Sequence, residues 1–343
     1  MKDLAKAADV SVMTVSRAFK ADKSIGADTR ERILRLAEQL GYVFDSTAAN
    51  FRNQRTDFVS VILPSINNAN FAETVDVLST QLALGGMQVL LGYTGYSLAR
   101  EEALIDQMLR RKPEAIVVTG GQHTPDARKL LAKAGIPVIE TWDWPQDPVQ
   151  HVVGFSNAEA IQGVVDHLVD RGYARISFLG GEQGDDFRGM ERRAGFVAAM
   201  ARHGLAADRL VPTGPAPASM KEGAAALALM LDRFPDTRAV VCASDPIAFG
   251  ALTECQRRGI DVPRDLAIAG FGAYEIAAIS HPRLTTIDPM PSEIGLRTAN
   301  LILRLLDPTA PEPEAPEQEG PIRIRIDWKL IPSESTGEST GTR

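Results

Sequence analysis

The chain is most constrained by a pattern that begins at residue 57, where short apolar runs of strand length alternate with segments of helical period. Roughly four such units precede residue 155, and three or four follow it. The runs are 57–65 (DFVSVILPS), 87–95 (MQVLLGYTG), 114–121 (EAIVVTGG), 137–142 (PVIETW), 151–157 (HVVGFSN), 174–181 (ARISFLGG), 239–244 (AVVCAS) and 265–272 (DLAIAGFG). Between the first two runs, one face of a helix expected over 71–84 carries Phe71, Val75, Leu78 and Leu82. Apolar strands that alternate with helices predict parallel sheets with right-handed crossovers, here in two similar lobes.

The first fifty residues predict a separate, all-helical domain. Helices are expected at about 3–8, 12–19 and 28–40, with Ser11 as the N-cap of the second and Gly41 as the stop of the third. Three short helices with a tight turn between the first two are typical of a helix-turn-helix domain. The expected fold class is therefore α/β: an all-α N-terminal headpiece followed by a two-lobed core of parallel sheets.

Charge is distributed unevenly between these two parts. The formal net charge is −7, yet residues 1–56 hold ten Lys/Arg against seven Asp/Glu, a balance of +3, and the remaining residues carry −10. A basic head on an acidic body indicates an anionic partner at one end of the chain.

Other protein classes are disfavoured by what the sequence lacks. Cys242 and Cys255 cannot build a disulfide framework and show no metal spacing, so we expect reduced thiols in a cytoplasmic protein without a metal. No signal peptide is recognisable, and no window approaches the roughly 18 apolar residues of a membrane span. Residues 179–184 (LGGEQG) lack the lysine of a phosphate-binding P-loop. Because no catalytic triad or paired-carboxylate constellation stands out either, we expect neither an enzyme nor a cofactor.

The end of the chain predicts little regular structure. Residues 307–321 contain five prolines and five acidic residues, which favours a solvated loop. Residues 322–331 (IRIRIDWKLI) alternate charged and apolar side chains, and so predict one strand with an exposed face. The Ser/Thr/Gly-rich tail after Pro332 is expected to be frayed.

The helix expected at 12–19 is suited to the major groove of DNA, because its outer face is slim. Val15 and Phe19 would face the domain core, whereas Val12 and Met13 face outward. Small or basic polar residues that bind phosphates or bases would be Thr14, Ser16 and Arg17. On spacing alone, an ordinary amphipathic helix in a small cap domain remains an alternative.

Residues 3–19 (DLAKAADVSVMTVSRAF) closely resemble the headpiece of the LacI/GalR family of transcription repressors, whose pattern is D-V-A-x-x-A-G-V-S-x-x-T-V-S-R. Matching positions are Asp3, Ala5, Ala8, Val10, Ser11, Thr14, Val15, Ser16 and Arg17. Residues 29–42 resemble the family's third helix, and the similarity extends to about residue 340. The DNA-binding residues that this resemblance implies are Ser11, Val12, Met13, Thr14, Ser16, Arg17 and Phe51. Since neither Val12 nor Met13 can form a strong hydrogen bond to a base, apolar contact with thymine methyl groups is expected there.

The resemblance divides the chain into a headpiece at 1–43, a hinge at 44–56 and an effector-binding and dimerisation core at 57–340. The hinge departs from the family's Y-x-P-N-x-x-A-x-x-L, because Phe44, Asp45 and Ser46 replace proline, asparagine and an often basic residue. Phe51 stands where a leucine usually wedges into the minor groove, a role that an aromatic ring can also fill. Asp45 near phosphates should weaken DNA binding.

The core resembles the family's periplasmic-binding-protein-like core, in which two lobes close on a small polar ligand at the carboxyl ends of the strands. The chain would cross between lobes near 155–160, 283–292 and 320–325. By resemblance, Phe71 forms an apolar wall and Arg192 clamps the ligand, as a guanidinium fork can do with vicinal hydroxyls or a carboxylate. Ser244 replaces a usual asparagine, whereas Asp245 is retained. Gly272 lacks the usual ligand-binding carboxylate, for which Glu275 is expected to substitute.

Within the family, three motifs resemble the gluconate-repressor branch: 270–277 (GFGAYEIA), 123–125 (HTP) and 186–188 (DFR). Arg188, Arg192 and His123 would supply positive charge for a carboxylate, so a sugar acid such as gluconate is the expected effector. Blander interpretations are that His123 lies exposed in a loop, that Phe71 is a core residue and that Arg188 is a surface charge.

The resemblance therefore implies a homodimeric repressor that binds palindromic operator DNA under control of a small-molecule effector, without membrane association. Two alternatives remain. The first is a solute-binding protein without a DNA role, which would be exported and would lack the headpiece. A sugar-acid enzyme on an α/β fold would need a catalytic constellation and detectable turnover.

Overall fold

The computed structural model describes residues 1–19, 24–42, 56–181, 186–307 and 320–337. It divides into two compact units, Met1–Thr56 and Asp57–Arg343. Each unit is described by itself.

The first unit is a three-helix domain. Its helices are α1 (Lys2–Ala7), α2 (Val12–Phe19) and α3 (Ala27–Gln39), within one residue of the bounds expected from the sequence. Each helix buries at least one large apolar side chain almost completely, namely Leu4, Val15 and Ile33. The inward orientation expected for Val15 is confirmed, and Phe19 packs against the same cluster.

The turn between α1 and α2 is built by Asp9 and Ser11. Asp9 has a φ of +50°, in the left-handed region that aspartate tolerates better than most residues other than glycine. The hydroxyl of Ser11 then accepts a hydrogen bond of 3.0 Å from the backbone N–H of Thr14, which confirms Ser11 as the N-cap of α2. At the other end of α2, the Nε of Arg30 donates to the carbonyl of Ala18 at 3.0 Å. These bonds fix α2 within its domain while leaving its outer face open.

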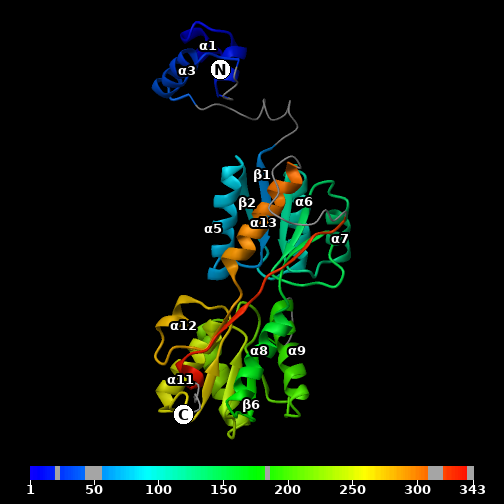
Figure 1. The fold of residues 1–343 in the computed structure, drawn as a ribbon, viewed down its shortest axis with the longest axis vertical. Coiled ribbons are helices and arrows are strands. Elements are labelled where there is room, and N and C mark those ends of the chain that lie inside the picture. The colour runs from blue at the N-terminus through cyan, green and yellow to red at the C-terminus, as the bar shows by residue number, and fades with distance from the viewer. Residues whose placement is uncertain (20–23, 43–55, 182–185, 308–319, 338–343) are drawn as a thin grey trace. The chain divides into compact units, whose positions relative to one another are not determined.

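The second unit consists of two α/β lobes (Figure 1). The first lobe has a parallel six-stranded sheet of order β11-β5-β4-β3-β1-β2. Its strands are β1 (Phe58–Leu63), β2 (Gln88–Tyr93), β3 (Ala115–Thr119), β4 (Val138–Thr141), β5 (His151–Gly154) and β11 (Arg323–Arg325). The helices of this lobe are α5 (Ala69–Leu84), α6 (Leu98–Leu109), α7 (Pro125–Ala132) and α13 (Pro291–Leu306). In β1, β3, β4 and β5 nearly every residue is buried, as expected for strands covered on both faces.

The second lobe repeats the architecture with a parallel four-stranded sheet of order β7-β6-β8-β9. Its strands are β6 (Ile176–Gly180), β7 (Leu210–Pro212), β8 (Ala239–Cys242) and β9 (Ala267–Ala269). Its helices are α8 (Asn157–Asp170), α9 (Phe187–Arg202), α10 (Met220–Arg233), α11 (Asp245–Arg258) and α12 (Glu275–Ile279). In both sheets the strand order reverses beside the first strand, at β1/β3 and at β6/β8. Ligands of such sheets bind at these switch points, beyond the carboxyl ends of the strands.

Three segments connect the lobes. The chain passes from β5 to α8 and returns between β10 (Thr286–Asp288) and α13, which packs against α5. It crosses again between β11 and β12 (Lys329–Ile331), which pairs with β10 in a two-stranded antiparallel ribbon. The single strand expected at 322–331 is therefore wrong. Asp327 and Trp328, between β11 and β12, separate a strand of the first lobe's sheet from a strand that pairs with β10.

The expectation of a frayed tail after Pro332 is also wrong as far as residue 337. A 3-10 turn, η1 (Glu334–Thr336), buries Ser335 and Thr336 almost completely. Ser335 donates to the carbonyl of Ile268 at 2.6 Å and accepts from the backbone N–H of Thr285 at 2.8 Å. A run of small hydroxyl residues is typical of an exposed loop. Here such a residue instead forms hydrogen bonds with backbone groups in β9 and before β10.

Within the described residues, no helix is long and apolar enough to cross a membrane, and no cluster of His, Cys, Asp or Glu is arranged to hold a metal. Cys242 and Cys255 are free and buried, and burial raises the pKa of the Cys255 thiol to about 12. The region at 307–321 expected to be a solvated loop lies, apart from its ends, outside the described residues.

Candidate functional site

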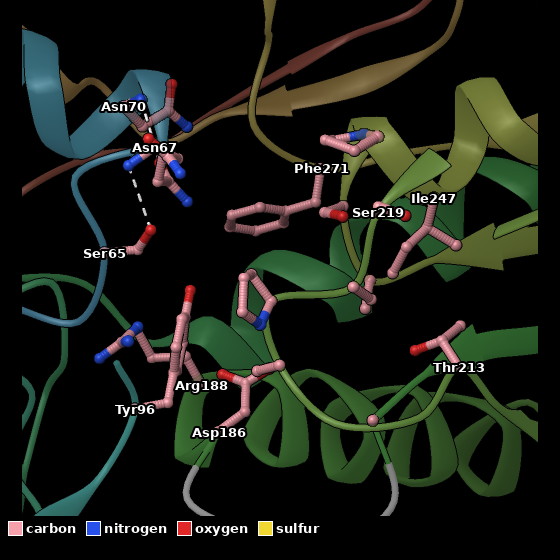
Figure 2. Close-up of a pocket in the computed structure, with 18 of the residues that line it drawn as sticks. Ser65, Asn67, Asn70, Tyr96, Asp186, Arg188, Thr213, Ser219, Ile247 and Phe271 are labelled. Atoms are coloured by element: carbon pink, nitrogen blue, oxygen red, sulfur yellow. Dashed lines mark hydrogen bonds between the residues drawn. The ribbon is translucent and has the colours of Figure 1, made fainter. Parts of the chain in front are cut away.

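A cavity of about 460 Å³ opens between the two lobes of the second unit (Figure 2). Loops at the carboxyl ends of both sheets form its walls, which is the location that the switch-point rule predicts. The first lobe contributes Ser65, Asn67, Asn68, Asn70, Phe71, Tyr96 and Trp142. The second lobe contributes Gly181, Asp186, Arg188, Arg192, Thr213, Gly214, Ala216–Lys221, Ala243, Ser244, Pro246, Ile247, Phe271 and Tyr274.

The first-lobe wall is organised by the start of α5. The side chain of Asn68 caps this helix by accepting hydrogen bonds from the backbone N–H groups of Asn70 and Phe71, at 3.1 and 3.2 Å. Phe71 is thereby turned inward, where its ring packs edge-on against Trp142 with the centroids 5.1 Å apart. Asn70 reaches the second lobe, because its Nδ2 donates to the carbonyl of Gly272 at 2.9 Å.

Arg192 is held rigidly at the cavity by three contacts. Its Nε donates to Oδ1 of Asn157 at 2.9 Å, and its Nη1 donates to the carbonyl of Ala243 at 2.8 Å. Its guanidinium carbon lies 3.7 Å from the centroid of the Phe271 ring. Burial lowers the pKa of Arg192, yet a guanidinium stays charged at neutral pH. The fork is thus pre-oriented to receive an anionic or polyhydroxy ligand.

Arg188 lies one turn earlier on α9 and is 7% exposed. Its guanidinium carbon lies 5.5 Å from the centroid of the Phe71 ring, and its side chain hydrogen-bonds Tyr96 of the first lobe. The interpretation of Arg188 as a surface charge does not fit this position. Two arginines from one helix therefore stack on one phenylalanine from each lobe, which places two positive charges at the cavity.

Carboxyl groups behind the arginines have altered pKa values. Burial raises the pKa of Asp143, which accepts hydrogen bonds from Asn157 and from the backbone of Gly121. Burial, together with the charge of Asp143, raises the pKa of Glu191 to about 7. Burial thus favours the neutral form of both carboxyl groups, which weakens the degree to which they offset the positive charge of the two arginines.

Ser244 lies on the cavity wall, whereas Asp245 lies behind it and is fully buried. The carboxylate of Asp245 accepts from the backbone N–H of Tyr274 at 2.8 Å and from the hydroxyl of Thr286 at 2.6 Å. Burial raises its pKa to about 6, against the effect of these hydrogen bonds. Asp245 thus positions the Tyr274 loop, and the geometry assigns it no direct ligand contact.

The structure does not bring Glu275 to the cavity, where the sequence placed it as a substitute carboxylate. Tyr274 lines the cavity instead, and Glu275 begins α12 with an exposed side chain. Gly272 could not carry a side chain, because a Cβ there would lie 2.3 Å from the Tyr274 ring. The ring therefore occupies the space that a carboxylate would need.

His123 is likewise absent from the cavity wall, and it is not the exposed loop residue of the alternative interpretation. Its imidazole is fully buried in the first lobe between Glu101 and Glu140, with Nδ1 2.5 Å from the first carboxylate and Nε2 3.3 Å from the second. Burial alone would lower its pKa, but the two carboxylates raise it to about 9. His123 is a core residue paired with two carboxylates, and it is not among the residues that line the cavity.

Several lining residues escaped the sequence reasoning, notably Tyr96, Trp142, Asp186, Thr213 and Tyr274. All but Asp186 lie shortly after a strand. That position was a usable signal, since the carboxyl ends of parallel strands meet at the ligand site. Tyr96 and Trp142 also adopt positive φ values of +64° and +71°, which the sequence does not reveal for non-glycine residues.

In the first unit, α2 presents the slim outer face expected from the sequence. Val12 and Met13 are 42% and 55% exposed although both are apolar. Ser11 and Arg17 are exposed, and Thr14 and Ser16 are half-buried beside them. Exposed apolar residues at the start of a capped helix suit contact with another macromolecule. Phe51 lies outside the described residues.

Comparisons with known proteins agree with both units. Residues 1–45 match a family model described as "Bacterial regulatory proteins, lacI family", and residues 165–325 match a periplasmic binding protein-like domain. The regulator GntR of Pseudomonas aeruginosa is 31% identical over 89% of either chain. A LacI-family transcriptional regulator from Silicibacter pomeroyi is 31% identical, with a TM-score of 0.87 over 98% of this chain and 99% of that one. The lac repressor dimer bound to operator shares the fold, at 20% identity and a TM-score of 0.84 over 98% of either chain.

Proposed function

Because the chain belongs to the LacI family and is a DNA-binding transcriptional regulator rather than an enzyme, we propose that its effector is a sugar acid, gluconate or a close relative. The observation that carries the proposal is the pair of buried arginines on α9, each stacked on a phenylalanine from a different lobe.

A guanidinium pairs with a carboxylate through two parallel charge-assisted hydrogen bonds, which are about twice as strong as neutral ones. Two of the donors of Arg192 are already bound to protein, so the guanidinium cannot rotate away from the cavity. The remaining wall supplies amides and hydroxyls, such as Asn67, Ser65 and Tyr96, that match the hydroxyl groups of an open-chain sugar. Charge and hydroxyl partners together favour an aldonate over a neutral sugar.

We assign residues 1–43 to DNA binding, 44–56 to a hinge and 57–340 to effector binding and dimerisation. A homodimer would present two copies of α2 to the half-sites of a palindromic operator in the cytoplasm. The hinge, including Phe44, Asp45 and Phe51, lies outside the described residues except at its last position.

Effector control follows from the contacts that already join the lobes. Arg188 bonds Tyr96, and Asn70 bonds Gly272, so a ligand in the cavity would touch groups on both sides of the cleft. A ligand that favours the closed lobes shifts the protein between DNA-binding states, with a coupling free energy of about 1–3 kcal/mol.

The function is tested by a gel-shift assay on the DNA upstream of the chain's own gene, with and without gluconate, at a stated salt concentration. We expect a sequence-selective shift that gluconate alters and that sorbitol, the same carbon chain without the carboxylate, does not. Absence of a selective shift at moderate salt would contradict the DNA role. Calorimetry that shows tight binding of a neutral sugar or a purine, without response to aldonates, would refute the proposed effector.

Replacing Arg17 by alanine is expected to weaken operator binding by about 1–3 kcal/mol, because the contact of this side chain with a base or a phosphate would be lost. Fluorescence anisotropy on labelled operator measures this change. Arg35→Ala, in an exposed pair with Glu31 on α3, is the matched control and should leave affinity unchanged. If Arg17→Ala also weakened gluconate binding, the residue would be structural instead.

A further inference from the structure

Thr213 is a buried polar residue of the cavity wall. It directly follows β7, its backbone N–H donates to the carbonyl of Gly180 at 3.1 Å, and it is 4% exposed. Its hydroxyl has no hydrogen-bond partner among the described residues, although it lines the cavity. A buried hydroxyl without a partner costs about 1–3 kcal/mol, so its retention at a cavity wall indicates a partner that arrives with the ligand.

The start of α11 brings further unused hydrogen-bonding groups to the second lobe's wall of the cavity. Ser244 makes no capping hydrogen bond to α11, although it occupies the N-cap. Pro246 in the first turn of α11 has no N–H, and the N–H of Ile247 lies too early in the helix to be used within it. Thr213 directly follows β7 and Ser244 lies two residues after β8, and these strands flank β6 on its two sides.

Lys221, in the first turn of α10, adds a positive charge to the wall that the second lobe contributes. Asp186 is the one acidic residue among the described lining residues, and Figure 2 shows it with Arg188, across the cavity from Thr213. The Glu222 carboxylate accepts a hydrogen bond from the backbone N–H of Ser219 in the capping box of α10. The N-terminus of this helix therefore already has an acidic partner within the protein.

We propose that Thr213, Ser244 and Lys221 form a second anion subsite, which binds the end of the effector remote from the arginines. The effector would then be acidic at both ends: a sugar acid that carries a phosphate ester or a second carboxylate on its terminal carbon. This inference rests on the proposed function, because the first acidic group is the one assigned to Arg188 and Arg192. A cavity of about 460 Å³ lies within the roughly 300–1,000 Å³ that is typical of small-molecule sites.

Isothermal titration calorimetry of the full chain with three acids tests the subsite. The probes are gluconate, which has one acidic end, and glucarate and 6-phosphogluconate, which have two. We expect one of the doubly acidic ligands to bind at least tenfold more tightly than gluconate, and the better of the two identifies a carboxylate or a phosphate. Thr213→Val and Lys221→Gln should each weaken that ligand about tenfold while changing gluconate affinity less than twofold. Lys133→Gln, at an exposed lysine beyond α7, is the matched control and should change neither.

The outcomes separate the two proposals. If gluconate binds as tightly as both doubly acidic ligands, or if the variants weaken all three acids equally, the subsite is refuted and the proposed function stands. If no acid binds while sorbitol or another neutral compound does, the proposed function itself fails. The unliganded Thr213→Val protein should melt at the same or a higher temperature, since it loses only an unpaired hydroxyl. A lower melting temperature would mean that the hydroxyl is structural and would overturn the subsite.

Discussion

Replacing Arg192 by methionine is expected to weaken gluconate binding about 100-fold, the largest effect predicted for any residue of the cavity. Methionine retains the apolar contact with Phe271 but removes the charge and every donor. Hydrogen bonds to charged groups contribute about 1.5–3 kcal/mol each, and the carbonyl of Ala243 would also lose its donor. Isothermal titration calorimetry measures the loss directly.

Two further variants make the Arg192 result specific. Arg192→Lys keeps the charge but not the planar fork, so an intermediate loss of about tenfold is expected. Arg202→Met removes an arginine from the same helix, where it pairs with Asp166 at the surface, and should leave gluconate affinity unchanged. A change of less than twofold for Arg192→Met would show that the acid binds elsewhere. Operator binding by the unliganded variant should persist, because α2 belongs to the other unit.

Replacing His123 by glutamine is expected to lower the free energy of unfolding by about 3–5 kcal/mol while leaving gluconate affinity nearly unchanged. The imidazolium is the only cation in hydrogen-bond contact with the buried Glu101 and Glu140 carboxylates among the described residues. Removing one member of a buried ionic cluster leaves uncompensated charge in the core. Urea unfolding of variant and wild type gives the difference. His203→Gln, whose imidazole pairs with Asp166 nearer the surface, is the control and should cost less than 1 kcal/mol.

The same residue predicts a pH dependence of stability. The pKa of His123 is about 9 in the folded protein, above the ordinary value of 6.5, so the folded state binds its proton more tightly. The contribution is complete below pH 6.5 and is lost as the pH rises through 9. Wild type should therefore lose more stability than His123→Gln between pH 6.5 and 9. Parallel profiles for the two proteins would contradict a charged His123.

The long elements of the fold were predictable because their patterns are local. The eight apolar runs correspond to eight of the strands. Both ends of α2 were predicted at the observed residues, from its N-cap and its periodicity. The short strands β7 and β10 were missed, since three residues carry no periodic signal and pair only when neighbouring strands already exist. The buried turn η1 was missed for a related reason: its partners Thr285 and Ile268 lie far away in sequence.

The site was predictable where a residue's direction follows from its element. Phe71, Arg188, Arg192 and Ser244 lie on the cavity wall, as the resemblance to the family implied. His123 and Glu275 do not, because loop residues turn according to contacts that sequence spacing leaves open. For His123 those contacts are Glu101 and Glu140, on two other elements. For Glu275 the relevant contact is the hydrogen bond that the backbone N–H of the neighbouring Tyr274 donates to the Asp245 carboxylate, because it positions Tyr274 at the cavity.

The buried turn η1 has a genetic consequence. A premature stop codon after position 332 would spare every side chain proposed to contact DNA or the effector. It would nevertheless strip Thr285 and Ile268 of the Ser335 bonds and expose the end of β9. Such an allele is expected to impair the protein although it spares those side chains. An in-frame fusion that interrupts the chain before Gly337 would break the same contacts.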